Sequence, residues 1–576
     1  MTENPVSPMR TAHFAATKIF KNQPFLASLW SSDGLFGKSS LRQWHQKRLE
    51  FATVFDASYG KIESITTALF HERKHAMRVT QNEQMVIGEV DISKIEFDPK
   101  SRDDIPKILR GLQFVYTNLP LRTAIFNLLE SKISPNVSKT NGRPGMTLWN
   151  ILVCGVIRLD LNCDYDRLHE LVNQHNTLRE MLGHGAFTDV SYHFQTLKDN
   201  VSLLTPELLD EINQLVVAAG HVLVKKKGAE ALRGRCDSFV VETNVHYPTD
   251  INLLFDAMRK TITLMGQWCE ELGMSDWRQH AYNVRQVKKA MRTAQNKKRS
   301  KAKSEEQVQK NKSLIIEAHQ SYLEIAKGYL DKAEQTLLSI ELHHALDPID
   351  LVRKMEIKGF IAHAVRQIDQ IRRRVIEGEV IPHAEKVFSI FQPHTEWISK
   401  GKAGVPVELG VKVCVVEDQH QFILYHQVMQ NLTDDQVTVD MVIQTKKRFP
   451  TFNACSFDKG FHSQKNQIDL KEQLDLAVLP RKGKLSKQAQ QEEKAESFVK
   501  ARRAHSAVES AINALEVHGL DVCPDHGITG FKRYVALAVL SRNIHRIGAI
   551  VWQQDREREQ RKASFANRDR PDKLAA

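Results

Sequence analysis

Three carboxylates stand where a strand or helix could hold them rigidly. Asp237 is the second residue of CDSFVVETNVHYPTD, which begins like a buried strand. Asp458 follows the short strand-like segment FNACSF, and Glu509 lies on the helical segment SFVKARRAHSAVESAINALEVHGL. Carboxylate oxygens are the ligands that Mg²⁺ prefers. If the three side chains meet, two such ions could stabilise the attacking and leaving oxygens of an in-line phosphoryl transfer.

Each acid alone also has an ordinary explanation. Asp237 could be a turn residue before a strand, and Asp458 begins Asp-Lys-Gly-Phe, a typical turn sequence. Glutamates such as Glu509 on amphipathic helices are usually solvated. The metal-site hypothesis therefore depends on the order of the elements that carry the acids.

Strands and helices around the acids are expected in a particular order. The pattern predicts a strand, a large helical stretch, a β-hairpin, a helix, a strand, a helix, a strand and a helix. Without the helical stretch, this is the order of a mixed sheet of the RNase H type. In such a sheet the first and fourth strands are neighbours, and the following helix packs across them. We predict an α/β fold: an RNase H-like core interrupted by a large helical insertion, with an all-helical N-terminal region.

Composition and periodicity divide the chain into five parts. The helices of the second part suit helix-turn-helix packing on DNA, although a plain helical bundle fits their periodicity equally well. The parts are residues 1–100, with no assigned role; a helical DNA-binding domain at 101–225; a catalytic core at 226–260 and 400–550; a helical insertion at 261–399; and a disordered charged tail at 551–576.

The charge is strongly basic. The 576 residues carry a net charge of +12, which favours a polyanionic partner, with nucleic acid ahead of a membrane surface. Residues 278–304 contain ten Lys or Arg and no acid. This stretch is either a solvated helix face or loop, or a surface that follows DNA phosphates. The residues predicted to contact DNA here are Lys288, Lys289, Arg292, Lys297, Lys298 and Arg299.

Cysteine use and hydropathy indicate the compartment. The seven cysteines are scattered without a CxxC pair, which disfavours a disulfide framework and a zinc ribbon. No run of about 18 apolar residues is present, so we expect a cytoplasmic, nucleoid-associated protein with no membrane partner. Cys523 and His526 near His518 could form a metal cluster, but a loop with a buried thiol is the favoured interpretation.

Several segments together resemble bacterial insertion-sequence transposases of the DDE type, a cut-and-paste, ISNCY-like group. The resemblance covers most of residues 100 to 550, and the acidic segments are specific only when taken in order. The matching segments are GRPGMTLWNILVCGVIRLDL, CDSFVVETNVHYPTDINLL, HTEWISKGKAGVPVELGVKV, CSFDKGFHSQKNQIDL and RRAHSAVESAINALEVHGLDVCPDHGITGFKRYVALAVLSRNIHRIG.

The resemblance implies a reaction and a set of ligands. Asp237, Asp458 and Glu509 would be the catalytic residues and would hold two Mg²⁺ ions, for which Mn²⁺ could substitute. Water would cleave the transposon end, and the freed 3′-OH would then attack target DNA without a covalent enzyme intermediate. The implied partners are double-stranded transposon ends and target DNA, bound by a homodimer or a larger synaptic complex.

One departure from the family concerns the third acid. Many relatives carry Tyr-x-x-Arg-x-x-x-Glu followed seven residues later by Lys; here those places are Arg502, His505, Glu509 and Glu516. We expect Arg502 and His505 to contact DNA, with His505 beside a phosphate. Glu516 rivals Glu509 as third ligand because the two share a helix face with His505. The route by which the second DNA strand is cut, through a hairpin or otherwise, stays open.

Further candidates lie near the predicted core. Trp397 could stack on an unpaired DNA base or belong to the core, and Lys400 and Lys402 follow it as DNA contacts. His246 and Asp250 either shape the site or belong to a turn. Two other functions fit the same pattern: an RNase H-fold nuclease without strand transfer, and a non-catalytic DNA-binding protein derived from a transposase.

Overall fold

The computed structural model describes most of the chain between residues 76 and 568. Within this span it leaves out residues 83, 86, 99, 134–142, 186, 229, 299–303 and 400–405. Arg299, Lys400 and Lys402 therefore lie outside the described residues, as do nearly all of the N-terminal region and the last eight residues. The described chain forms two compact units, one of residues 76–245 and 394–568 and the other of residues 246–393.

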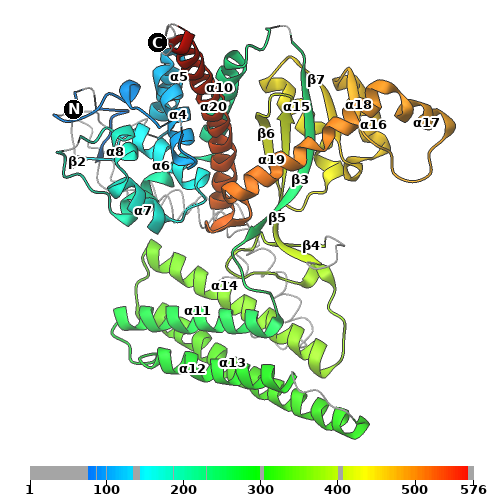
Figure 1. Cartoon of the computed structure of the whole chain (residues 1–576). Helices are drawn as coiled ribbons and strands as arrows, with labels where there is room; N and C mark the ends of the chain where they lie inside the picture. The colour runs from blue at the N-terminus through cyan, green and yellow to red at the C-terminus, as the bar shows by residue number, and fades with distance from the viewer. Residues whose placement is uncertain are drawn as a thin grey trace, which may run out of the picture. The chain divides into compact units, whose positions relative to one another are not determined.

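The larger unit contains a mixed seven-stranded sheet (Figure 1). β5 is antiparallel to both of its long neighbours, β6 and β3, whereas β3, β7 and β8 run parallel. Two short strands, β4 and β9, pair with the ends of β5 and β3. In spatial order the long strands are β6 (Ile423–Met429), β5 (Val407–Asp418), β3 (Leu232–Thr243), β7 (Phe452–Phe457) and β8 (Leu476–Val478), with β4 at Glu396–Ser399 and β9 at Val522–Cys523.

The predicted hairpin is confirmed as β5 and β6. Both strands are rich in Val and Ile, which suit a buried pleated surface. Asp418 forms the turn, because its Oδ1 accepts hydrogen bonds from the backbone N–H groups of His420 and Phe422 at 2.8 and 2.9 Å. Gln421 takes a positive φ of 68°, which completes the reversal of the chain.

The helices before β3 share a hydrophobic core with the sheet and with the long C-terminal helix α20. Apart from the two-residue pair β1 (Ala76–Met77) and β2 (Arg143–Pro144), the described part of this region has no strand. The helices are α4 (Ile105–Thr117), α5 (Leu119–Ile133), α6 (Leu148–Asp160), α7 (Tyr165–Gln174), α8 (Asn176–Met181), α9 (Phe194–Val201), α10 (Pro206–Leu223) and α20 (Gly527–Arg568).

Glycines let α20 cross α4 at close range. A Cβ atom on Gly548 would lie 2.0 Å from the carbonyl oxygen of Lys107, and one on Gly111 would lie 2.3 Å from that of Ile544. Only glycine fits at such a backbone contact. This crossing holds the N-terminal helices on the same core as the sheet.

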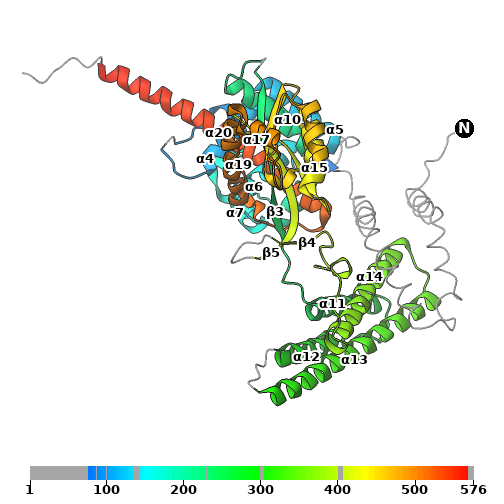
Figure 2. The ribbon, with the colours of Figure 1, turned by 90° about the vertical axis from the view of Figure 1, so that its right-hand side faces the viewer.

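α20 extends farther than the sequence pattern indicated. Residues 551–568 were expected to be disordered, but they continue the helix (Figure 2). Their Glu, Arg, Gln and Ala residues are strong helix formers, and Glu557 stands four positions before Arg561, a spacing that favours a helix. High charge alone therefore did not indicate disorder here, because the same residues favour an exposed helix.

The segment that carries the third acid is broken rather than one long helix. It consists of α18 (Glu496–His505), α19 (Ala507–Leu515) and the π-helical turn η5 (Glu516–Leu520). At the first break Ser506 donates a hydrogen bond from Oγ to the carbonyl of Arg503, which competes with the helix ladder. At the second, Gly519 has a φ of 102°. Other helices beside the sheet are α15 (Asp434–Arg448), α16 (Gln464–Gln473) and α17 (Lys487–Lys494).

The smaller unit is helical and has a core of its own. Trp268 and Trp277 are buried in it, and their indole N–H groups donate to Asp350 and Thr336. No helix among the described residues is long and apolar enough to cross a membrane. The helices are α11 (Asp250–Glu271), α12 (His280–Lys298), α13 (Glu305–His343) and α14 (Pro348–Ile371), followed by the π-helical turn η2 (Arg372–Ile376).

Candidate active site

Strand register places Asp237 beside Asp458. β3 and β7 are parallel, and Cys236 pairs with Phe457, the last residue of β7. An acid follows each member of this pair: Asp237 follows Cys236, and Asp458 follows Phe457. The two acids therefore stand at neighbouring positions across the two strands, whose backbones are about 5 Å apart. Asp237 lies in the middle of β3 and not at its start, because the strand already begins at Leu232.

The strand pairing opens beside Asp237. β7 pairs with β3 only as far as Cys236, and β9 pairs with it from Glu242 onward. Among the described strands, none pairs with residues 237–241 of β3 on this side. Asp237 and Asp458 therefore lie at the carboxyl end of β7, where a ligand can reach the edge of an α/β sheet.

The third acid comes from α19, which packs against β3. α19 buries Val508, Ala511 and Leu515 and leaves Glu509 exposed. An amphipathic helix seated on the strand thus presents its carboxylate near the strand ends rather than in the core.

The charges of these acids act on one another. The pKa of Asp237 is raised to about 6, first by burial and then by the carboxylates of Asp458, Asp434 and Glu509, while the backbone N–H of Ser238 acts in the opposite direction. Like charges disfavour the ionised form of a neighbouring acid. The charges of Asp458 and Glu509 therefore both reach Asp237.

The three acids do not form a compact group of ligand atoms. Among the described residues, a different set of side chains has its potential metal-binding atoms all within 4.8 Å of one another: Asp160, His518 and His545. Carboxylates repel one another, so a wider spacing is expected of them without a cation between them.

His505 stands beside these acids. Its Nδ1 lies 3.0 Å from Oγ of Ser456, which is on β7 two residues before Asp458. Burial lowers the pKa of His505, although the charges of Asp458 and Glu509 act to raise it. A histidine with a pKa below its usual value is neutral near pH 7. Its ring can then donate one hydrogen bond and accept another next to the acids without adding a positive charge.

Asp434 is a fourth acid that sequence patterns did not single out. It is the first residue of α15, where it accepts a hydrogen bond from Ser238 Oγ at 2.7 Å and pairs with Lys412 Nζ at 3.1 Å. Acids in the first turn of a helix are common, which hid its position beside β3. Its charge is among those that raise the pKa of Asp237, so it belongs to the electrostatic surroundings of the site.

The rival acid Glu516 is in a different setting. It lies in η5, which packs against α6, α20 and β9, whereas α19 with Glu509 packs against β3. Glu516 continues directly from α19 with a helical backbone (φ −62°, ψ −45°), so it stays a rival to Glu509 as third ligand; the helix is interrupted instead at Ser506, between His505 and Glu509.

The basic candidates belong to the smaller unit and to the flank of the sheet. Lys288, Lys289, Arg292 and Lys297 are exposed on α12, opposite its buried side chains. None of these four has a salt-bridge partner in the described part of the chain, which leaves their charges available to a polyanion. Lys298 is the last residue of α12.

The remaining candidates are spread over the two units. Trp397 is half-buried on β4, and Arg502 is exposed on α18. His246 pairs with Asp256 at 3.4 Å, and Asp250 pairs with Arg374 at 2.6 Å. These ion pairs tie His246 and Asp250 to the helical unit.

The structure separates Cys523 from the metal cluster considered for it. Cys523 is buried on β9, and its Sγ lies 3.9 Å from the carbonyl oxygen of Asp525. His518 instead faces Asp160 and His545, which come from far earlier and later in the chain. No local spacing rule could have found that grouping.

Comparison with known proteins adds no relative. No protein-family model matches the chain, and neither a curated protein nor a solved structure matches it significantly.

Proposed function

We propose that this protein is a divalent-metal-dependent DNA transposase of the DDE type, acting through Asp237, Asp458 and Glu509. The observation that carries the proposal is the register of β3 and β7, which brings Asp237 next to Asp458 while α19 adds Glu509. Asp237 and Asp458 follow paired residues of β3 and β7, and the charge of Glu509 reaches Asp237.

The strand order supports an RNase H-like core. Leaving aside the short β4 and β9, the strands of the sheet follow in the chain as β3, β5, β6, β7 and β8, and lie side by side as β6, β5, β3, β7 and β8. The first strand therefore neighbours the fourth, as the RNase H-like arrangement requires. The helical unit is inserted in the sequence between the first strand and the hairpin.

The donor set fits hard cations. The three candidate ligands offer only carboxylate oxygens, which suit Mg²⁺ or Mn²⁺. Burial raises the pKa of Asp237 to about 6, and the charges of Asp458 and Glu509 add to the rise. Two such ions would supply charge neutralisation at the phosphate undergoing displacement.

The chain itself provides position and DNA affinity. β3 pairs with β5 through Asp237 and with β7 up to Cys236, so the backbone is held rigidly as far as the reacting edge. His505 can hydrogen-bond a phosphate oxygen through the ring nitrogen that does not face Ser456. The exposed cations of α12 can neutralise backbone phosphates. Two transposon ends must be held together for strand transfer, which favours a homodimer or larger assembly.

The test is a plasmid excision and integration assay with the purified full chain and Mg²⁺. We expect Asp237→Asn, Asp458→Asn and Glu509→Gln each to reduce cleavage by on the order of 10³-fold, because each removes charge stabilisation needed in the transition state. The matched control is Ser510→Ala, a change at the exposed position that follows Glu509 on α19. Wild-type cleavage in all three acid variants would refute the site.

The products separate the competing functions. Cleavage followed by joining supports the transposase. Cleavage without joining would identify a nuclease, and DNA binding without cleavage in any divalent metal would identify a non-catalytic binding protein.

The basic face of α12 predicts a salt effect. Replacing Lys288 and Lys289 with Gln should reduce the slope of log affinity for DNA against log salt by about 1.8, since each phosphate contact contributes roughly 0.9. A Lys310→Gln/Lys327→Gln variant makes the same charge change at exposed positions of α13 and serves as the control. Equal slopes in the two variants would mean that net charge, and not this face, governs binding.

A further inference from the structure

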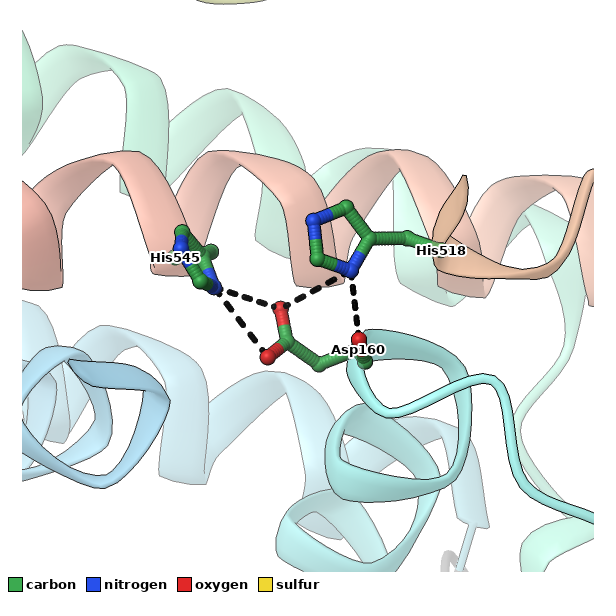
Figure 3. Close-up of side chains that lie close together, drawn as sticks. All are labelled: Asp160, His518 and His545. Carbon is green, nitrogen blue, oxygen red and sulfur yellow. Dashed lines mark hydrogen bonds and ion pairs between the residues drawn. The ribbon is translucent and has the colours of Figure 1, made fainter. Parts of the chain in front are cut away.

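Asp160, His518 and His545 form a compact group in the larger unit, hereafter the Asp160 cluster (Figure 3). Asp160 ends α6, His518 lies in η5, and His545 lies in α20. Each ring turns one nitrogen toward Asp160. α6 and two later elements, η5 and α20, thus present a carboxylate and two imidazole nitrogens to one point.

The distances suit a small metal ion. His545 Nδ1 lies 3.0 and 3.1 Å from the two carboxylate oxygens of Asp160, and His518 Nδ1 lies 3.9 Å from Oδ1. The ring centroids of the two histidines are 5.1 Å apart. Ligands about 2.0–2.1 Å from a tetrahedral ion are separated from one another by about 3.3 Å. The group needs only small adjustments to reach that spacing.

The negative charge of Asp160 is buried, which is unfavourable unless a partner balances it. The Asp160 side chain is 0% exposed, while the two histidine side chains are each 13% exposed. Arg542 is the nearby cation whose pKa the Asp160 charge acts to raise, but the Glu417 charge acts on it more strongly, and burial lowers that pKa overall. Neutral histidines compensate a buried carboxylate only through hydrogen bonds, whereas an ion bound to Asp160 would balance its charge.

We propose that the Asp160 cluster is a binding site for a divalent transition metal of the Zn²⁺ class. Imidazole nitrogen with one carboxylate suits Zn²⁺, Co²⁺ or Ni²⁺ better than Mg²⁺. The partly exposed edges of the histidines leave room for water as a fourth ligand. Binding requires each imidazole to be neutral with its proton on Nε2, so the hydrogen bond of His518 Nδ1 to the Asp160 carbonyl, now 2.5 Å, is given up.

The site would join three elements. An ion here connects the end of α6 and the middle of α20 to η5, the turn that directly follows α19. Its effect is a cross-link within the larger unit, and it is independent of the carboxylates at β3 and β7.

The experiment uses the full chain, stripped with a chelator and titrated with Co²⁺ alone. We expect the tetrahedral nitrogen-ligand absorption band of Co²⁺ to saturate at one ion per chain, and the melting temperature to rise with Zn²⁺. His518→Asn and His545→Asn keep a side-chain N–H near the Nδ1 position but remove the ligand, so each should weaken Co²⁺ affinity at least tenfold. His193→Asn, an exposed position before α9, is the matched control.

A further variant locates the ion. Asp237→Asn should leave the Co²⁺ band unchanged, because Asp237 is not a member of the Asp160 cluster. Absence of saturable Co²⁺ binding to the wild-type chain would overturn the proposal. So would unchanged affinity in the histidine variants, or loss of the band in Asp237→Asn. If one histidine variant fails to fold by circular dichroism, the other histidine variant and the wild-type band decide the outcome.

Discussion

Two carboxylate-bearing groups in the larger unit show opposite solutions to the same problem. Beside the middle of β3 and the end of β7, acids lie near one another, and the pKa of Asp237 is raised to about 6. In the Asp160 cluster, a fully buried carboxylate faces two imidazoles within hydrogen-bonding or ion-pairing range. The first group has unbalanced charge at an accessible edge, and the second has its polar atoms paired inside the fold.

The two groups differ in whether the surroundings of the carboxylate destabilise or stabilise its charged form. Acids that destabilise one another at a strand edge persist where a cation or substrate can neutralise them. A buried acid surrounded by donors contributes to stability even without an ion, because each hydrogen bond to a charged group is favourable. Removing a carboxylate should therefore have opposite effects on folding in the two places.

The largest expected effect concerns Glu509 and Glu516, which stand on α19 and η5. Glu509→Gln should reduce metal-dependent DNA cleavage by roughly 10³-fold, whereas Glu516→Gln should change it by less than about threefold. Initial rates of plasmid cleavage at saturating Mg²⁺ measure both variants. If Glu516→Gln loses cleavage instead, the third ligand belongs to η5. The acidic site and the Asp160 cluster would then share an element and would not be independent.

The next effect concerns the stability provided by Asp160. Asp160→Leu keeps an apolar volume in the core but leaves Nδ1 of His545 without its carboxylate partner, so it should lower the free energy of unfolding by about 2–3 kcal/mol. Urea unfolding of the chelator-treated chain at pH 7.5 measures the loss. A change below about 0.5 kcal/mol would show that the hydrogen bonds to the Asp160 carboxylate carry no net stability.

The smallest effect is a gain in stability at the acidic site. The folded chain binds a proton at Asp237 more tightly than the unfolded chain, since its pKa rises from 3.8 to about 6. The associated stability is full below about pH 4 and is lost as the pH rises through about 6. Asp237→Asn removes this loss. A rise of about 2 in pKa corresponds to about 3 kcal/mol, an upper limit that solvent around the partly exposed carboxyl reduces, so at pH 7.5 without metal the variant should be more stable by roughly 1–2 kcal/mol.

The pH profile provides the check on that sign. The stability difference between Asp237→Asn and the wild type should be near its maximum at pH 7.5 and should shrink toward pH 4. Urea unfolding at several pH values in the presence of EDTA measures it. A variant that is less stable than the wild type at pH 7.5 would mean that Asp237 is compensated like Asp160, and the contrast between the two groups would disappear.

Local patterns predicted much of the sheet and its acids. Alternating and β-branched residues marked the hairpin of β5 and β6, and turn chemistry marked the end of β7 before Asp458. These features depend on residues that are close in sequence, so the sequence alone can predict them. Asp434 was missed because an acid in the first turn of a helix looks the same whether or not a strand lies beside it.

The breaks and extensions of helices were harder to foresee. The interruption at Ser506 depends on one side-chain hydrogen bond, and the π-helical turn that follows α19 packs against α6 and α20. The extension of α20 to Arg568 competes with solvation of a highly charged segment, so composition alone favoured disorder. In each case tertiary contacts or small local differences outweighed the average preference.

The sequence by itself determined which residue types were available: an acid at the start of an apolar segment, an acid at the end of another, and an acid on an amphipathic helix. The tertiary structure decided which of them meet. The pairing of Cys236 with Phe457 sets Asp237 beside Asp458, and the crossing of α20 over α4 and α6 brings His545 to Asp160. Register and helix crossing depend on contacts between residues hundreds of positions apart, which no local periodicity encodes.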